Sequence, residues 1–346
     1  MEPARPRRFI LFSCPRTASN LLVRILNLQN QPELAKPPPQ GGYYFLPSIM
    51  KANDLMVREK HMKEWTEEER SEMQQVYQAG FDEFQKYVNG AQDSGKIAFI
   101  KEHSTMFAEP TNICKMMFPN DEVREEPWLL QMANSIDETP MRSSLNETML
   151  PDQFLNTLLP AFLVRHPALS FPSFERQMGK LTDVFTVVSP ERKVQMTYKW
   201  SRSLYDYYAN LLSESEPVGD DGTTWPLVLE ADDIIKQPEV VIRFCELMGL
   251  DKTKLLFSWE KVSQEQLEKM SKGMKTMLGT LNSSDGINTN NVSSDIDIDV
   301  EAKKWKEEFG EDVGAEIEQH VRNAMPDYEF FKSKRLRPAC TTNINI

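Results

Sequence analysis

Four short apolar runs constrain the fold of this chain more than any other feature of its sequence. They are RFILFS from residue 8, KIAFIK from residue 96, AFLVR at 161–165 and WPLVLE at 225–230. Each run is almost continuously apolar, which is typical of a strand covered on both faces. Long stretches with helical or mixed patterns separate the runs. This order predicts an α/β protein with an open parallel sheet and crossover helices.

The segments between and after these runs predict helices. Residues 54–87 are highly charged with amphipathic spacing, and we expect helices laid over the first half of the sheet. A helix is expected over 238–250, with Pro238 in its first turn and Gly249 at its end. A last amphipathic helix is expected from about 301 to 324.

The length of 346 residues suits one large α/β domain or two smaller ones, and we expect one. Its expected parts are a domain over 1–336, helical insertions at about 50–90 and 105–160, a mobile Ser/Asn/Asp-rich loop at about 281–300, and a flexible tail at 337–346.

Composition narrows the class of function. A net charge of −12 argues against a general nucleic-acid-binding protein, which usually has a basic excess. The four cysteines are scattered without a C-x-x-C pair, so they are interpreted as reduced thiols and not as disulfides or a zinc site. No apolar stretch is long enough for a membrane span or a signal sequence. We therefore expect a cytoplasmic protein without a membrane partner.

The first apolar run leads into Ser13-Cys14-Pro15-Arg16-Thr17-Ala18-Ser19-Asn20, and a helical pattern follows from about Thr17. A helix that starts directly after a strand offers free N–H groups and a positive dipole end to an anion. The loop lacks the glycine and lysine of the nucleotide loop G-x-x-x-x-G-K-[ST]. Two interpretations stay open here, a phosphate loop of another kind and an ordinary strand-to-helix turn.

Two further runs end in polar residues that parallel strands would bring to the same edge of the sheet. In KIAFIKEHST, alternation places Lys101 and His103 on one face and Glu102 on the other. In AFLVRHPALSFPSFERQ, Arg165 ends the strand and Ser173 lies in the first turn of a helix expected from about Ser170. Each also has a structural interpretation: a histidine bonded to a carbonyl, a structural arginine and a capping serine.

Two more features have double interpretations. Glu230, at the end of WPLVLE, either belongs to the acidic metal-holding strand of an NTPase or orients basic residues of the first loop. The aromatic residues near 41–45, with Trp65 and Phe107, either line an apolar acceptor pocket or belong to the core.

Taken together and in this order, the motifs resemble those of the sulfotransferase superfamily, which uses the donor 3′-phosphoadenosine 5′-phosphosulfate (PAPS). The loop is similar to the P-R-[ST]-[GA]-[ST] loop of a branch common in fungi and bacteria, which wraps the 5′-phosphosulfate. The resemblance assigns that role to five residues, Arg16, Thr17, Ala18, Ser19 and Asn20. It assigns the 3′-phosphate to Arg165 and Ser173.

The resemblance also implies a fold and a mechanism. The fold would be a three-layer open parallel sheet with a topology like that of the P-loop NTPases. His103 would be the general base, with Arg16 and Lys101 as further catalytic residues and Arg16 in the place of the usual loop lysine. Leu21 falls where many relatives place a tryptophan near the adenine, so Tyr198 and Trp200 are candidates for that contact, and Lys272-Gly273 and Lys275 for the basic C-terminal loop.

The expected activity is sulfuryl transfer from PAPS, without a metal, to the hydroxyl of a small aromatic or secondary-metabolite acceptor. Three alternatives remain open at this point: sulfation that drives elimination or cyclisation, an NTP-dependent kinase-like enzyme, and a non-catalytic nucleotide-binding homologue. A homodimer is compatible with the sequence, and no nucleic-acid partner is expected.

Overall fold

A computed structural model describes residues 7–38, 41–133, 139–181, 189–213, 217–219, 221–289, 292–293 and 296–338. Four strands of this part of the chain form one parallel sheet in the order β2-β1-β3-β4. They are β1 (Arg8–Ser13), β2 (Ala98–His103), β3 (Leu159–Val164) and β4 (Leu227–Glu230). Almost every strand residue is buried, which explains why the runs are continuously apolar. The predicted open α/β sheet is confirmed.

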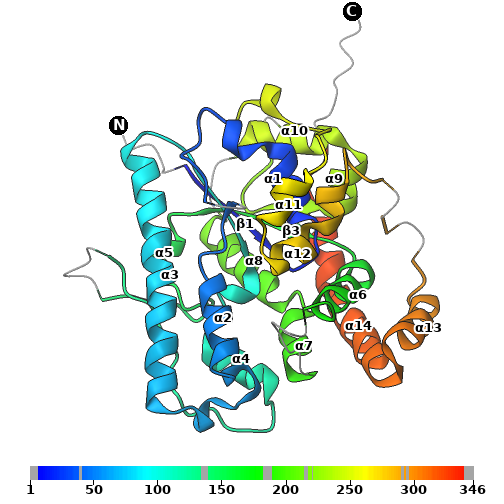
Figure 1. The fold of residues 1–346 in the computed structure, drawn as a ribbon. Helices are drawn as coiled ribbons and strands as arrows, with labels where there is room; N and C mark the ends of the chain where they lie inside the picture. The colour runs from blue at the N-terminus through cyan, green and yellow to red at the C-terminus, as the bar shows by residue number, and fades with distance from the viewer. Residues whose placement is uncertain are drawn as a thin grey trace, which may run out of the picture.

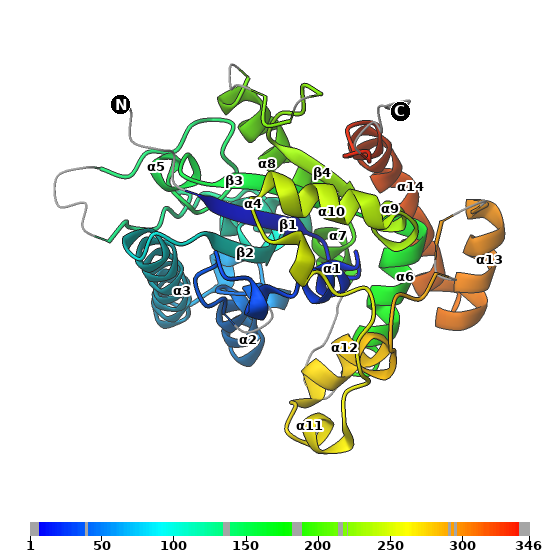
Figure 2. The ribbon, with the colours of Figure 1, turned by 90° about the horizontal axis from the view of Figure 1, so that it is seen from above.

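Helices begin directly after three of the strands. They are α1 (Ser19–Leu26) after β1, α6 (Pro167–Met178) after β3, and α9 (Ala231–Lys236) followed by α10 (Pro238–Leu247) after β4. Because the strands are parallel, the N-termini of α1, α6 and α9 gather at the carboxyl edge of the sheet, where open α/β folds bind ligands (Figure 2).

The remaining helices cover the sheet and extend beyond it (Figure 1). They are α2 (Leu46–Asp54), α3 (Glu67–Asp93), α4 (Pro110–Met117), α5 (Asp152–Leu155), α7 (Ser189–Gln195), α8 (Lys199–Leu211), α11 (Gln264–Glu268), α12 (Lys272–Ser283), α13 (Ile298–Phe309) and α14 (Glu311–Ser333). None of the helices in the described residues is both long enough and apolar enough to cross a membrane.

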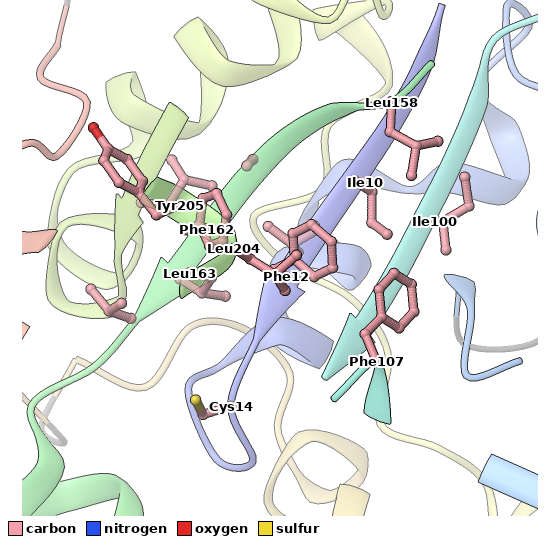
Figure 3. Close-up of a cluster of buried hydrophobic side chains, with 14 of the residues drawn as sticks. Ile10, Phe12, Cys14, Ile100, Phe107, Leu158, Phe162, Leu163, Leu204 and Tyr205 are labelled. Atoms are coloured by element: carbon pink, nitrogen blue, oxygen red, sulfur yellow. The ribbon is translucent and has the colours of Figure 1, made fainter. Parts of the chain in front are cut away.

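Aromatic side chains join the centre of the sheet to the helices on one face. Phe12 of β1 lies 5.3 Å from the ring of Phe162 on β3, stacked, and 5.3 Å from the ring of Phe107, edge-on (Figure 3). Tyr208 of α8 approaches the same ring. Aromatic pairs in these geometries stabilise the core beyond the energy of burial alone. They therefore hold in place the end of β1, from which the loop at Cys14 begins.

Three predicted boundaries were wrong. The single C-terminal helix is two helices, α13 and α14, because Gly310 between them has φ 87°, a left-handed backbone that a helix cannot contain. Helix α6 starts at Pro167, before Ser170, because the His166 side chain caps it by accepting a hydrogen bond from the Ala168 N–H (3.2 Å).

The third boundary is that of the loop expected at 281–300. Helix α12 continues through Ser283 and α13 begins at Ile298, so the non-helical segment is shorter at both ends. Ser293, within it, donates to the Asp232 carboxylate from its N–H (2.7 Å) and its hydroxyl (2.5 Å). Most of the expected tail, from 339 onward and including Cys340, lies outside the described residues, in which Cys14, Cys114 and Cys245 are free thiols.

Candidate active site

The loop between β1 and α1 has an unusual backbone. Arg16 and Ala18 have φ 66° and 68°, in the left-handed region where glycine is the usual residue. The Thr17 hydroxyl is buried and donates to the Cys14 carbonyl (2.8 Å), which fixes the turn from inside. Alternating backbone conformations of this kind point successive N–H groups toward one spot, and the N-terminus of α1 adds its own. The loop therefore has the shape of an anion site.

Two arginines and a serine meet beside this loop; Arg165 is buried and Arg16 is half-buried. The Arg16 Nε donates to the Ser173 hydroxyl (3.0 Å), and Arg165 Nη1 donates to the Arg16 carbonyl (3.2 Å). Burial lowers the pKa of both arginines, and the neighbouring Arg165 lowers that of Arg16 further. Among the described residues, no carboxylate forms an ion pair with Arg16. A buried cation of this kind is stabilised by an anionic ligand.

The Arg165 backbone is held by Tyr198, the residue expected at the adenine. The Tyr198 side chain is fully buried, accepts from the Arg165 N–H (3.0 Å) and donates to the Arg165 carbonyl. Trp200 is also buried and donates to the Val194 carbonyl (3.0 Å). Neither ring lines the cavity described below.

Glu230, at the end of β4, has a structural role here. Its Oε2 accepts from the N–H groups of Asp232 (2.7 Å) and Asp233 (3.2 Å), which caps α9, and its Oε1 accepts from the Tyr328 hydroxyl (3.2 Å). Burial and the neighbouring Asp232 raise the pKa of Glu230 to about 7. In the described part of the chain, no group of three or more His, Cys, Asp or Glu side chains could hold a metal ion.

His103 ends β2 and its ring is bonded on both nitrogens. Nδ1 lies 3.0 Å from the Ser13 hydroxyl, which itself donates to the Glu102 carbonyl (3.4 Å). With the hydroxyl proton used in that way, Nδ1 carries the ring's proton and donates to Ser13. Nε2 then offers its lone pair to the Tyr43 hydroxyl, 3.3 Å away. Burial and, second, Lys101 lower the pKa of His103 to about 3, so the ring is neutral at physiological pH.

Lys101 lies beneath the loop and is fully buried. Its Nζ donates to the Asn20 Oδ1 (2.5 Å) and lies 4.4 Å from the centre of the Tyr43 ring. Burial lowers the pKa of Lys101 and raises that of the adjacent Glu102, while each group favours the charged form of the other. Lys101 does not line the cavity, so its position suits orienting Asn20 and Tyr43.

A cavity of about 690 Å³ opens at this edge of the sheet. One side of it, the donor half, is lined by Arg16, Ala18, Ser19, Asn20, Arg165 and Ser173. The other side, the acceptor half, is lined by Leu46, Ile49, Met50, Arg58, Met106 and Glu191. Tyr43 and His103 also line the cavity. The structure thus brings together seven predicted residues, His103, Arg16, Ala18, Ser19, Asn20, Arg165 and Ser173, whereas Thr17, Lys101 and Tyr198 do not line the cavity.

The acceptor half contains a buried ion pair that sequence reasoning missed. Arg58 pairs with Glu191 of α7, and the two side chains are 16% and 5% accessible to solvent. Burial lowers the pKa of Arg58 to about 10. The pair also lines a second, small cavity of about 90 Å³, which Trp65 lines as well. No sequence motif joins residues 58 and 191, which are brought together only by the packing of α7 on the segment at 57–59.

Some of the other residues predicted to contact a ligand line the cavity, and others do not. Lys272 and Gly273, at the start of α12, line the cavity, whereas Lys275 does not. Of the aromatic residues near 41–45, only Tyr43 reaches the cavity, and Phe107 is core. The signal for Tyr43 was present in the sequence as the Gly-Gly pair that precedes it, but the pair does not specify which ring faces the histidine.

Comparisons with known proteins show which proteins this chain is similar to. The chain is 38% identical over 337 residues to the sulfotransferase ppzF of Metarhizium rileyi, a match that covers 97% of this chain and 98% of the relative. It is 39% identical over 336 residues to the sulfotransferase ppzF of Metarhizium majus, covering 96% and 98%. The sulfotransferase domain of the Synechococcus PCC 7002 olefin synthase aligns with a TM-score of 0.39 and 15% identity, over 89% of this chain and 96% of that one. No family model matches the chain.

Proposed function

The chain belongs to the sulfotransferases, and from this premise we propose that it transfers a sulfuryl group from PAPS to a hydroxyl of a small aromatic or secondary-metabolite acceptor. The observation that carries the proposal is the meeting of Arg16, Arg165 and Ser173 at the loop. PAPS has two anionic groups, and two neighbouring guanidinium groups beside the N-terminus of a helix suit both.

In this proposal, the residues of the donor half hold the donor. The backbone N–H groups of Ala18 and Ser19, together with the Arg16 guanidinium, bind the 5′-phosphosulfate, and Arg165 with Ser173 binds the 3′-phosphate. PAPS supplies the electrophilic sulfuryl group and a phosphate leaving group. Charge that develops on the transferring group is stabilised by Arg16 and by the start of α1, so the residues present are sufficient for electrostatic catalysis.

His103 is the general base in this proposal. Its Nε2 is the unprotonated nitrogen because Nδ1 donates to Ser13, which fixes both the tautomer and the orientation of the ring. The low pKa of the buried ring keeps it neutral until it receives the proton of the acceptor. The apolar side chains of the acceptor half, with Leu46, Ile49 and Met50, suit an acceptor with an apolar body.

The test is calorimetry with adenosine 3′,5′-bisphosphate and, separately, with ATP and Mg²⁺. We expect micromolar binding of the bisphosphate without metal, and loss of that binding in Arg165→Ala. Lys275→Ala, an exposed charge that does not line the cavity, is the matched control and should bind normally. Selective binding of ATP with Mg²⁺ would overturn the proposal in favour of a kinase-like enzyme.

His103→Ala tests the base separately. We expect it to retain binding of the bisphosphate and to lose about 10²–10⁴-fold in the rate of PAPS-dependent sulfonation. Unchanged sulfonation would show that another group accepts the proton. Mass analysis of the product separates a stable sulfate ester from an elimination or cyclisation that releases inorganic sulfate.

A further inference from the structure

Tyr43 is held against the end of β2 by an unusually close approach of two backbones. A Cβ atom on Gly42 would lie 1.9 Å from the Lys101 carbonyl oxygen, so only glycine fits there. The next residue, Tyr43, donates its N–H to the same carbonyl (3.2 Å) and has φ 74°. A left-handed backbone is rare for a bulky side chain, and such strain is concentrated at functional sites.

This backbone places the Tyr43 hydroxyl on the lone pair of the proposed base. The hydroxyl lies 3.3 Å from His103 Nε2, and the two ring centres are 5.1 Å apart. Nδ1 is already bonded to Ser13. An acceptor hydroxyl that enters the cavity therefore meets a histidine nitrogen that is already in contact with the tyrosine oxygen.

The surroundings of Tyr43 suit proton transfer through its oxygen. Burial raises the pKa of Tyr43, so the hydroxyl is protonated at neutral pH and holds a proton that it can pass on. Negative charge that develops on its oxygen would be stabilised by the bond to the Ser19 side chain and by the nearby Arg16, and opposed by Glu102. Displacing the ring would break its contact with Lys101, whose Nζ lies 4.4 Å from the ring centre, so the ring is better placed to relay than to move aside.

We propose that Tyr43 is a catalytic residue that relays the acceptor's proton to His103. In one step, the acceptor oxygen forms its bond to sulfur as the bond from sulfur to the phosphate oxygen of the donor breaks. The acceptor's proton passes to the Tyr43 oxygen, and the Tyr43 proton passes to His103 Nε2. Tyr43 ends the step as a neutral phenol and His103 as an imidazolium. This inference rests on the proposed function of the site.

The test compares two phenols as acceptors with PAPS as donor at mildly alkaline pH. 2-Naphthol still carries its proton there, whereas 4-nitrophenol is largely ionised and has no proton to relay. In Tyr43→Phe we expect the single-turnover rate with 2-naphthol to fall by about 10²-fold, and the rate with 4-nitrophenol by less than about fivefold. A merely structural role for Tyr43 would lower both rates alike.

The matched control is Tyr44→Phe. Tyr44 stacks on Phe84 with ring centres 5.0 Å apart and does not line the cavity, so both rates should stay within about twofold of the unaltered enzyme. If the unaltered enzyme sulfonates neither phenol, the rate of PAPS hydrolysis is measured in their place. Water is then the acceptor, and it carries a proton to relay. If Tyr43→Phe does not fold, 3-fluorotyrosine at position 43 keeps the shape and the hydrogen bond while it changes the acidity of the hydroxyl.

The outcomes separate this inference from the proposed function. An unaltered enzyme that neither binds adenosine 3′,5′-bisphosphate nor turns over PAPS would overturn the proposed function and, with it, the relay. An active enzyme whose Tyr43→Phe variant has unchanged or faster transfer to 2-naphthol would overturn the relay alone. An equal loss with both phenols would reduce Tyr43 to a positioning residue and would also overturn the relay.

Discussion

The two halves of the cavity use positive charge in opposite ways. In the donor half, Arg16 is half-buried without a carboxylate partner among the described residues, and its guanidinium is bonded to a hydroxyl and a carbonyl. In the acceptor half, Arg58 is also half-buried but is paired with Glu191. A buried cation left unpaired suits an anionic ligand, whereas a cation already neutralised only shapes a pocket. The comparison therefore separates a half built to bind charge from a half built to bind an apolar body.

The largest expected effect comes from removing the unpaired charge. Arg16→Ala should lower kcat/KM for PAPS by about 10²–10³-fold, because the stabilisation of charge on the transferring group is lost. Steady-state kinetics with varied PAPS measure it. Arg16→Lys should restore part of the activity, because a lysine supplies the charge but cannot also keep the bonds to Ser173 and the Met277 carbonyl.

Lys275→Ala serves again as the control for a charge outside the cavity. A normal rate of sulfuryl transfer in Arg16→Ala would contradict the proposal that the donor half binds the anionic donor through this charge. Full activity in Arg16→Lys would instead indicate that only the charge matters, and that the planar fork at Ser173 is incidental.

Removing charge from the acceptor half should affect stability and leave donor binding alone. Glu191→Gln leaves Arg58 buried without its partner, and we expect the free energy of unfolding to fall by about 3 kcal/mol. Affinity for adenosine 3′,5′-bisphosphate should stay within about twofold, because Arg16 and Arg165 are untouched. Denaturant unfolding and calorimetry on the same variant measure the two quantities.

Two controls bracket this result. Glu265→Gln breaks the exposed pair with Lys269, whose side chains are 79% and 73% accessible, and should change stability by less than about 0.5 kcal/mol. The double variant Arg58→Met with Glu191→Leu should recover most of the lost stability, since apolar residues replace buried ion pairs well. A large loss of donor affinity in Glu191→Gln would contradict the independence of the halves.

The difference between the halves also explains which part of the site could be predicted from the sequence. The donor half is formed by strand ends and the helix starts that follow them, so its residues lie within short sequence motifs. Arg165 and Ser173 were predicted as a pair from a spacing within one strand–helix unit, and the structure places both beside Arg16. Parallel strands bring such ends to one edge, and the four apolar runs were enough to predict that edge.

The acceptor half could not be predicted in this way. Arg58 and Glu191 are separated by more than a hundred positions and meet through helix packing that no local pattern specifies. Tyr43 depends on the approach of Gly42 to β2, a tertiary contact. The bond between the Tyr198 hydroxyl and the Arg165 backbone is a further tertiary contact that no local pattern in the sequence indicates.

The smallest expected effect concerns strain in the backbone of the donor loop. The same substitution, alanine to glycine, is made once in each half. Ala18 has φ 68°, a conformation that costs alanine about 1–2 kcal/mol and glycine almost nothing. Ala18→Gly should therefore be neutral or stabilising by less than about 1 kcal/mol, since the relief is offset by the greater freedom of glycine in the unfolded chain. Ala52→Gly, within helix α2 beside the acceptor half, should destabilise by about 1 kcal/mol or more. Urea unfolding measures the change in the free energy of unfolding for each variant. Changes of opposite sign would support a strained loop whose shape is imposed by its neighbours, whereas equal destabilisation by both variants would contradict it.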